Sequence, residues 1–174
     1  SLEGEFGSWA FACLNLAMGA RPGSPRCTRP ANRTLPLLAP APPEATTQVI
    51  DARDLAAFVL GLVERDVAGA FNATGDAMTM SALLDGIGSG VGSSAKLVWV
   101  APEFLLAQGV EPWSELPLWL PADSGGMGGV SNARAHANGL ALRAVSDTAR
   151  DALAWLRATP AGHAARTWEL VSIP

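Results

Sequence analysis

Residues 49–63, VIDARDLAAFVLGLV, decide the fold class, because in them a strand signal passes directly into a helix signal. The run TTQVI at 46–50 is rich in β-branched side chains and predicts a short strand. Beyond it, apolar residues recur at the spacing of a helix that buries one face, at Leu55, Phe58, Val59, Leu62 and Val63. The sequence therefore predicts a strand followed by a helix.

Two carboxylates stand where this helix begins. Asp51 and Asp54 fall at positions where the unpaired N–H groups of a helix start need acceptors. They also have the spacing of a pair of carboxylates for acid–base chemistry. Capping explains both residues with fewer assumptions, so we interpret them as capping residues.

The same alternation continues along the chain. Residues 69–75, GAFNATG, predict a strand, and Thr79 is a suitable cap for a helix that carries Met80, Leu83, Leu84 and Ile87. Residues 96–100, KLVWV, form a continuous apolar run after the lysine and predict a buried strand. Pro102 then opens a helix that Gly109 stops.

The last third of the chain contributes further elements. Residues 111–120, EPWSELPLWL, predict either a short helix or a packed loop. A helix is expected over 131–139, a short strand over 140–145, and a final helix capped by Ser146. Strands that alternate with helices of about ten residues are typical of α/β proteins, in which the strands form a largely parallel sheet.

Composition excludes several classes of function. The chain has 174 residues, of which 49% are hydrophobic and 16% charged, as expected for a compact globular protein. A net charge of −4 leaves no basic face for nucleic acid. Cys13 and Cys27 are not arranged as a zinc or disulfide motif, so we expect a cytoplasmic protein without a metal. The apolar run at 8–20 is too short to span a membrane.

The organisation along the chain has three parts. We expect residues 1–45 to be an irregular, extended segment with at most short strands, because seven prolines lie within residues 21–43. Residues 46–160 hold the α/β pattern, and residues 161–174 read as a tail. His136 and His163 stand apart from each other and from other candidate ligands, so we assign neither of them a metal or catalytic role.

Residues 46–158 resemble the C-terminal region of the extended short-chain dehydrogenase/reductase superfamily. The segments that carry the resemblance are VIDARDLA at 49–56, GAFNATG at 69–75, VEPWSELPLW at 110–119 and the closing helices from Asn132 to Trp155. They are most similar to bacterial NAD-dependent epimerase/dehydratase proteins of the isoflavone-reductase-like type. The resemblance implies a partial Rossmann-like parallel sheet with a C-terminal substrate lobe, and a nucleotide-binding half that is missing from this chain.

The chemistry of that family depends on two motifs that this sequence lacks. The family's proton donor is a tyrosine four positions before a lysine, but the chain has no tyrosine and its single lysine is Lys96. The family's phosphate cradle is a glycine-rich turn between a strand and a helix. Here the glycine run is GIGSGVG at 86–92, which follows a helix and which we interpret as a loop. We therefore assign no catalytic residue.

The resemblance also suggests binding residues. Pro22 and Gly23 match a Pro-Gly pair that lies near the nicotinamide in the family. Trp113 and Trp119 fall in the substrate-side segment, and Arg134 is suited to an anionic substrate. Core packing for the tryptophans and a solvated helix face for Arg134 are the simpler alternatives.

The combined hypothesis is a C-terminal, substrate-side fragment of an NAD(P)-dependent epimerase, dehydratase or reductase that is inactive alone. NAD or NADP is then the cofactor of the family, not bound by this chain by itself, and a small molecule is the substrate. Two alternatives remain open: a non-catalytic binding or partner module, with a homo-oligomer as one arrangement, and the remnant of a degraded reading frame.

Overall fold

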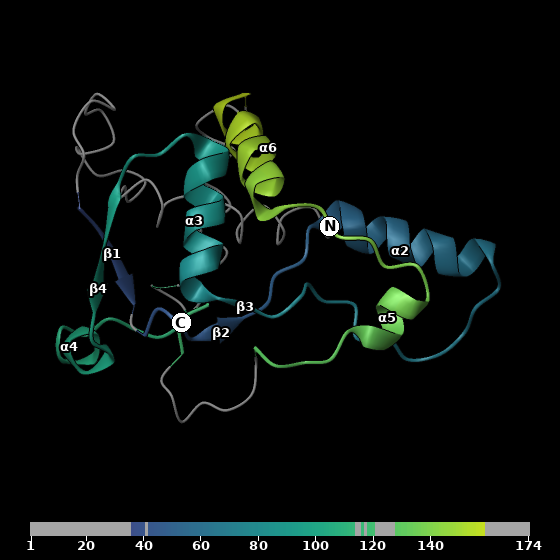
Figure 1. Cartoon of the computed structure of the whole chain (residues 1–174), viewed down its shortest axis with the longest axis horizontal. Coiled ribbons are helices and arrows are strands. Elements are labelled where there is room, and N and C mark those ends of the chain that lie inside the picture. The colour runs from purple at the N-terminus through teal and green to yellow at the C-terminus, as the bar shows by residue number, and fades with distance from the viewer. Residues whose placement is uncertain (1–35, 41, 114–115, 117, 121–127, 159–174) are drawn as a thin grey trace, which may run out of the picture.

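The computed structural model describes residues 36–40, 42–113, 116, 118–120 and 128–158 (Figure 1). This part of the chain is a mixed α/β structure with two small sheets and five helices. In chain order the elements are β1 Pro36–Pro40, β2 Thr46–Thr47, α2 Ala52–Glu64, β3 Met78–Thr79, α3 Met80–Val91, β4 Lys96–Val100, α4 Pro102–Ala107, α5 Ala133–Ala137 and α6 Val145–Ala158.

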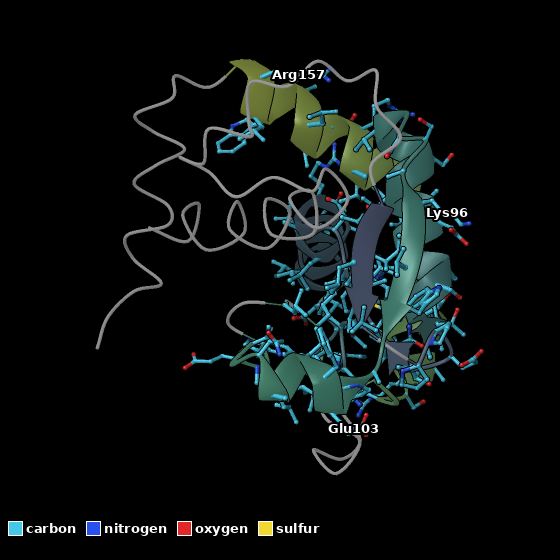
Figure 2. The ribbon with its side chains drawn as sticks, turned by 90° about the vertical axis from the view of Figure 1, so that its left-hand side faces the viewer. Lys96, Glu103 and Arg157 are labelled. Carbon is cyan, nitrogen blue, oxygen red and sulfur yellow. The ribbon has the colours of Figure 1, made fainter. Side chains whose placement is uncertain are left out.

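The larger sheet pairs β1 with β4 in parallel, with Leu38 opposite Val98. Parallel strands need a long crossover, and α2 and α3 lie in the chain between them. Figure 2 shows the two strands side by side, with α4 at one end, beyond Val100, and α6 at the other. The strand predicted at 96–100 is confirmed, but the prediction that it is buried is wrong, because Lys96 and Val98 are exposed.

The smaller sheet pairs β2 with β3 in antiparallel orientation. The strand predicted at 46–50 is thus limited to its first two residues. The strands predicted at 69–75 and 140–145 are wrong, since the structure has no strand in either range. A strand requires a neighbour to pair with, and β-prone residues alone do not supply one.

Helix α2 begins as the sequence predicts. The side chain of Asp51 accepts a hydrogen bond from the backbone N–H of Arg53 at 2.8 Å and so caps the helix. The interpretation of Asp54 as a second cap is wrong. Its carboxylate is buried and accepts two hydrogen bonds from Arg143, from the backbone N–H at 2.8 Å and from Nε at 2.7 Å. Its Oδ1 also forms an ion pair with Nη2 of Arg143 at 2.7 Å.

The glycine run at 86–92, which we interpreted as a loop, lies largely within helix α3. Thr79 caps it as predicted, by accepting from the N–H of Ala82 at 3.1 Å. The helix then continues through Val91, so that residues 86–91 are helical rather than a loop, and Gly92 ends it with a φ of 67°. The run is helical because it packs against α6, where a Cβ on Gly90 would lie 2.2 Å from the carbonyl oxygen of Ser146.

Helices α4, α5 and α6 occur where the sequence predicts helices, but α5 covers only Ala133–Ala137 of the predicted 131–139, and the start of α6 also differs. Ser146 does not cap α6, because α6 begins at Val145 and the N–H groups of Asp147 and Thr148 both donate to the carbonyl of Ala144. Gly109 and Gly139, which follow α4 and α5, have φ values of 73° and 93° that favour glycine.

Three apolar clusters hold these elements together. The largest joins the inner face of β1 with α3 and α6, through Leu37, Ala39, Met80, Leu83, Leu84, Ile87 and Ala149. A second surrounds Phe58 of α2 and includes Ala135 of α5 and Leu140. A third, Leu105, Leu116 and Trp119, fills the space beside α4. In the part of the chain that the structure describes, no helix is long and apolar enough to cross a membrane.

Candidate functional site

The segment that follows α4 forms a packed loop, which is one of the two structures predicted for it. Trp119 is only 3% exposed and contacts Leu105 and Leu116, with Val100 and Val110 packed around them. Trp113 is 37% exposed, and its backbone N–H donates to the carbonyl of Trp119 at 3.1 Å. We call residues 110–113, 116 and 118–120 the tryptophan loop.

Two features set the tryptophan loop apart from ordinary packing. The indole Nε1 of Trp119 is buried, and no acceptor for it lies among the described residues. An unpaired buried donor costs about 1–3 kcal/mol. Trp113 and Leu118 both have a φ of 65°, a left-handed conformation that is unfavourable for large side chains. Strain and an unsatisfied donor in one short segment are typical of binding sites.

The structure does not bring the predicted site residues together. Arg134 lies on α5, with its guanidinium carbon 4.8 Å from the centre of the Phe71 ring, in a cation–π contact. Figure 1 places α5 and α4 on opposite sides of the molecule, so Arg134 is remote from the tryptophan loop. Pro22 and Gly23 lie outside the described residues, as does His163.

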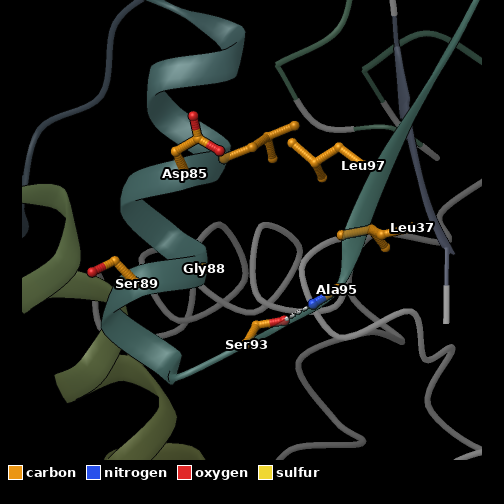
Figure 3. A pocket seen from close by; sticks show the side chains of 8 residues that line it. Leu37, Asp85, Gly88, Ser89, Ser93, Ala95 and Leu97 are labelled. Carbon is orange, nitrogen blue, oxygen red and sulfur yellow. Dashed lines mark hydrogen bonds between the residues drawn. The ribbon is translucent and has the colours of Figure 1, made fainter. Parts of the chain in front are cut away.

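A small cavity lies between α3 and the β1–β4 sheet. Its volume is about 110 Å³, several times the space of one water molecule but well below that of a dinucleotide pocket. Figure 3 shows Asp85 and Ser89 on α3, with Leu37 and Leu97 on the strands. The hydroxyl of Ser93 accepts from the N–H of Ala95 at 3.2 Å. The sequence analysis did not find this cavity, because it depends on how α3 crosses the sheet.

A network of charges ties the start of α2 to α6. Arg53 donates to Asp51 through Nε and Nη2 at 2.9 and 2.7 Å, and through Nη1 to Asp151 at 2.7 Å. The Thr148 hydroxyl donates to Asp51 at 2.7 Å. The Arg53 guanidinium, with Thr148, holds the pKa of Asp51 well below its usual range, although burial opposes the shift. Both oxygens of the Asp51 carboxylate thus have partners within the chain, which agrees with its interpretation as a capping residue.

A second charged pair joins α5 to the chain before β3. His136 Nε2 lies 2.8 Å from an oxygen of Asp76, and Nδ1 lies 3.0 Å from the carbonyl oxygen of Leu140. Asn132 also donates to Asp76 at 2.8 Å. Both partners of the imidazole are acceptors, so only the doubly protonated ring can donate to both of them. The hydrogen bond with Asp76 raises the pKa of His136 above its ordinary value.

These pairs do not form a metal site or a catalytic triad. Among the described residues, no group of three or more His, Cys, Asp or Glu side chains could hold a metal ion. The sequence analysis missed the pairing of His136 with Asp76 because the two residues are 60 positions apart. No family model, curated protein or solved structure matches this chain.

Proposed function

We propose that this chain provides the substrate-side part of an NAD(P)-dependent epimerase/dehydratase-type protein, and that it transfers no hydride by itself. The tryptophan loop is the part that contacts the substrate, which is a small molecule with hydroxyl or carbonyl groups. The finer fold belongs to the same proposal: a partial Rossmann-like arrangement whose nucleotide-binding half is not part of these 174 residues.

The observation that carries the proposal is the indole N–H of Trp119. It is a buried donor without an acceptor among the described residues, next to backbone at Leu118 that is held in a left-handed conformation. A hydroxyl or carbonyl oxygen of a small ligand has the acceptor that this donor lacks. The ordered segments similar to the epimerase/dehydratase proteins add to this support, because the loop falls in their substrate-side segment.

The residues that the structure describes do not fit a dinucleotide. The glycine run that comes nearest to a phosphate cradle forms the second half of α3, so its N–H groups lie within a helix and not at a helix start. Gly90 is placed against Ser146 of α6 rather than toward open space. With no tyrosine in the sequence, the family's proton donor is absent as well. No step through NAD or NADP is therefore assigned to this chain.

The substrate-side role can be tested with protein labelled with ¹⁵N in its indole groups. We expect small polyols and hydroxyketones to shift the Trp119 indole resonance, with Trp113 following and Trp155 unchanged. Trp155 is the matched control because it lies on α6, at the other end of the β1–β4 sheet from α4 (Figure 2). If such compounds move all of the indole resonances alike, or none of them, the tryptophan loop is not a binding site.

The absence of redox chemistry has a separate test. Titration with NADH and NADPH, followed by nucleotide fluorescence, should give no saturable signal in the micromolar range. Saturable micromolar binding, or turnover of either nucleotide by the purified chain, would contradict this half of the proposal and leave the loop unaffected.

One observation favours a second candidate function, that of a non-catalytic partner module. Helix α2 exposes Val59, Leu60 and Val63 to solvent at 48%, 62% and 73%. The prediction that Val59 and Val63 belong to the buried face of this helix is therefore wrong. A helix that is apolar on the face away from its own core is usually covered by another element. If a partner covers these three side chains only transiently, replacing all of them with glutamine should raise the solubility of the chain. The same replacement should leave its melting temperature unchanged. A lower melting temperature would instead make these residues part of this chain's own stability.

A further inference from the structure

The cavity between α3 and the β1–β4 sheet lies where α3 has no side chain to fill it. Gly88 lines the cavity, and a Cβ on Gly88 would meet no atom within 4 Å. Across from α3, Leu37 of β1 and Leu97 of β4 are partners in the register of the sheet, and both line the same space. Together with Leu84 of α3, these leucines give the cavity an apolar wall beside the space at Gly88.

Asp85 is the one charged residue among those that line the cavity. Figure 3 shows it on α3 at one end of the cavity, with Ser93 at the other end and Gly88 between them. Within the described part of the chain, the Asp85 carboxylate forms no hydrogen bond or ion pair. Lys96 does not neutralise it, because successive side chains of a strand point to opposite faces and the neighbouring Leu97 faces α3. The cavity therefore has an apolar wall and, at one end, a carboxylate that no described cation pairs with.

We propose that this cavity binds a short aliphatic amine in its protonated form, with the ammonium group at Asp85 and the alkyl chain beside Gly88 against the leucines. The carboxylate supplies both an acceptor and the opposite charge. Helix α3 ends at Val91, and the carbonyl end of a helix also favours a cation. The cavity volume of about 110 Å³ is somewhat smaller than the roughly 150 Å³ that hold a benzene molecule, so about five non-hydrogen atoms fit. Butylammonium has this size.

The inference is independent of the tryptophan loop, because none of the loop residues lines this cavity. Its test uses the whole chain, with butylammonium chloride as the probe and butanol as the neutral molecule of the same length, at constant ionic strength. Butylammonium should shift the backbone amide resonances of Gly88 and Ser93 saturably. We expect a Kd of roughly 1–10 mM, because so few atoms make few contacts. Butanol should bind about two to five times more weakly, as expected for the loss of a partly exposed charge pair.

Two substitutions on α3 test the position of the ligand. Gly88→Leu places a side chain in the cavity and should abolish the saturable shift at Ser93. Ala82→Leu is its matched control, because it adds the same side chain at an exposed position of α3 that does not line the cavity. Asp85→Asn should remove the preference for butylammonium over butanol. Glu64→Gln, which removes a negative charge at the end of α2, should keep this preference.

The outcomes separate the cavity from the charge. If no amide shift saturates, or if Gly88→Leu binds butylammonium like the wild type, the cavity is not a ligand site and the inference is overturned. Equal Kd values for butylammonium and butanol, or a preference that survives Asp85→Asn, overturn the assignment of the ammonium group to Asp85. If Gly88→Leu does not fold, Gly88→Ala decides: it should raise the Kd of butylammonium at least twofold, and an unchanged Kd overturns the inference.

Discussion

Two alanine substitutions on α3, two residues apart, should change stability in opposite directions. At Gly88 a Cβ would meet no atom within 4 Å, whereas at Gly90 it would lie 2.2 Å from the carbonyl oxygen of Ser146. Both substitutions gain about 0.5–1 kcal/mol from helix propensity. Gly90→Ala must also force α3 and α6 apart, and overpacking of this kind costs about 1–3 kcal/mol or more. Because the gain in helix propensity is common to both, the two variants should differ by the overpacking cost alone, about 1–3 kcal/mol or more.

Urea unfolding followed by far-UV circular dichroism measures this difference. We expect the midpoint to rise for Gly88→Ala and to fall for Gly90→Ala, with the dependence on urea unchanged. Gly86→Ala should lie between them, because its Cβ would be 3.2 Å from the Cβ of Val145, a side chain that has some room to move. If Gly88→Ala and Gly90→Ala shift the midpoint equally, the close crossing of α3 and α6 is refuted.

Three further predictions concern single interactions. Arg143→Ala should lower the free energy of unfolding, measured with urea, by about 3 kcal/mol, because it leaves the buried Asp54 carboxylate unpaired. Arg143→Lys should restore only part of this free energy. The pKa of His136 is raised above its ordinary value of 6.5 by the bond to Asp76. The stabilisation from this bond should therefore be complete below pH 6.5 and be lost as the pH rises through the raised pKa. In an NMR titration Asp76→Asn should lower the pKa of His136, and an unchanged pKa would count against the pairing. Trp119→Phe should leave the melting temperature nearly unchanged, because it removes the unsatisfied indole donor. Trp119→Ala should lower the free energy of unfolding by about 3–5 kcal/mol. A large loss of stability in the phenylalanine variant would mean that the indole N–H has a partner.

The sequence predicts helices well and strands less well, for a physical reason. Helix starts depend on nearby residues, so the caps at Asp51 and Thr79 and the proline at the start of α4 are all correct. A strand depends on a partner that is distant in the sequence. GAFNATG at 69–75 has the alternation of a strand over residues 70–73, but no strand lies beside it within the described residues, so it joins neither sheet.

Long-range packing also explains the error at the glycine run. Three glycines in six residues lower helix propensity by about 1 kcal/mol each, which favours the loop that we expected. The close contact of Gly90 with α6, 56 residues further along the chain, outweighs this preference, and no local pattern reveals it. The buried Asp54–Arg143 pair is hidden for the same reason, since its partners are 89 residues apart.

The candidate site was predictable only in part. The tryptophan loop was found because its composition is unusual, with two tryptophans and two prolines in ten residues. Its burial of Trp119 and the unsatisfied indole nitrogen depend on the packing of α4 and could not be predicted. Arg134 was a candidate by residue type alone, and the structure places it on the Phe71 ring instead of beside the tryptophans.

The pairing of Asp54 with Arg143 has a consequence for synthesis on the ribosome. When α2 leaves the exit tunnel, the arginine that neutralises its buried carboxylate has not yet been translated, and neither has α6, which covers α3. Strand β1 likewise waits for β4, 60 residues later. The nascent chain therefore keeps apolar surface open to chaperones until α6 emerges, and these elements acquire their packing in one late step.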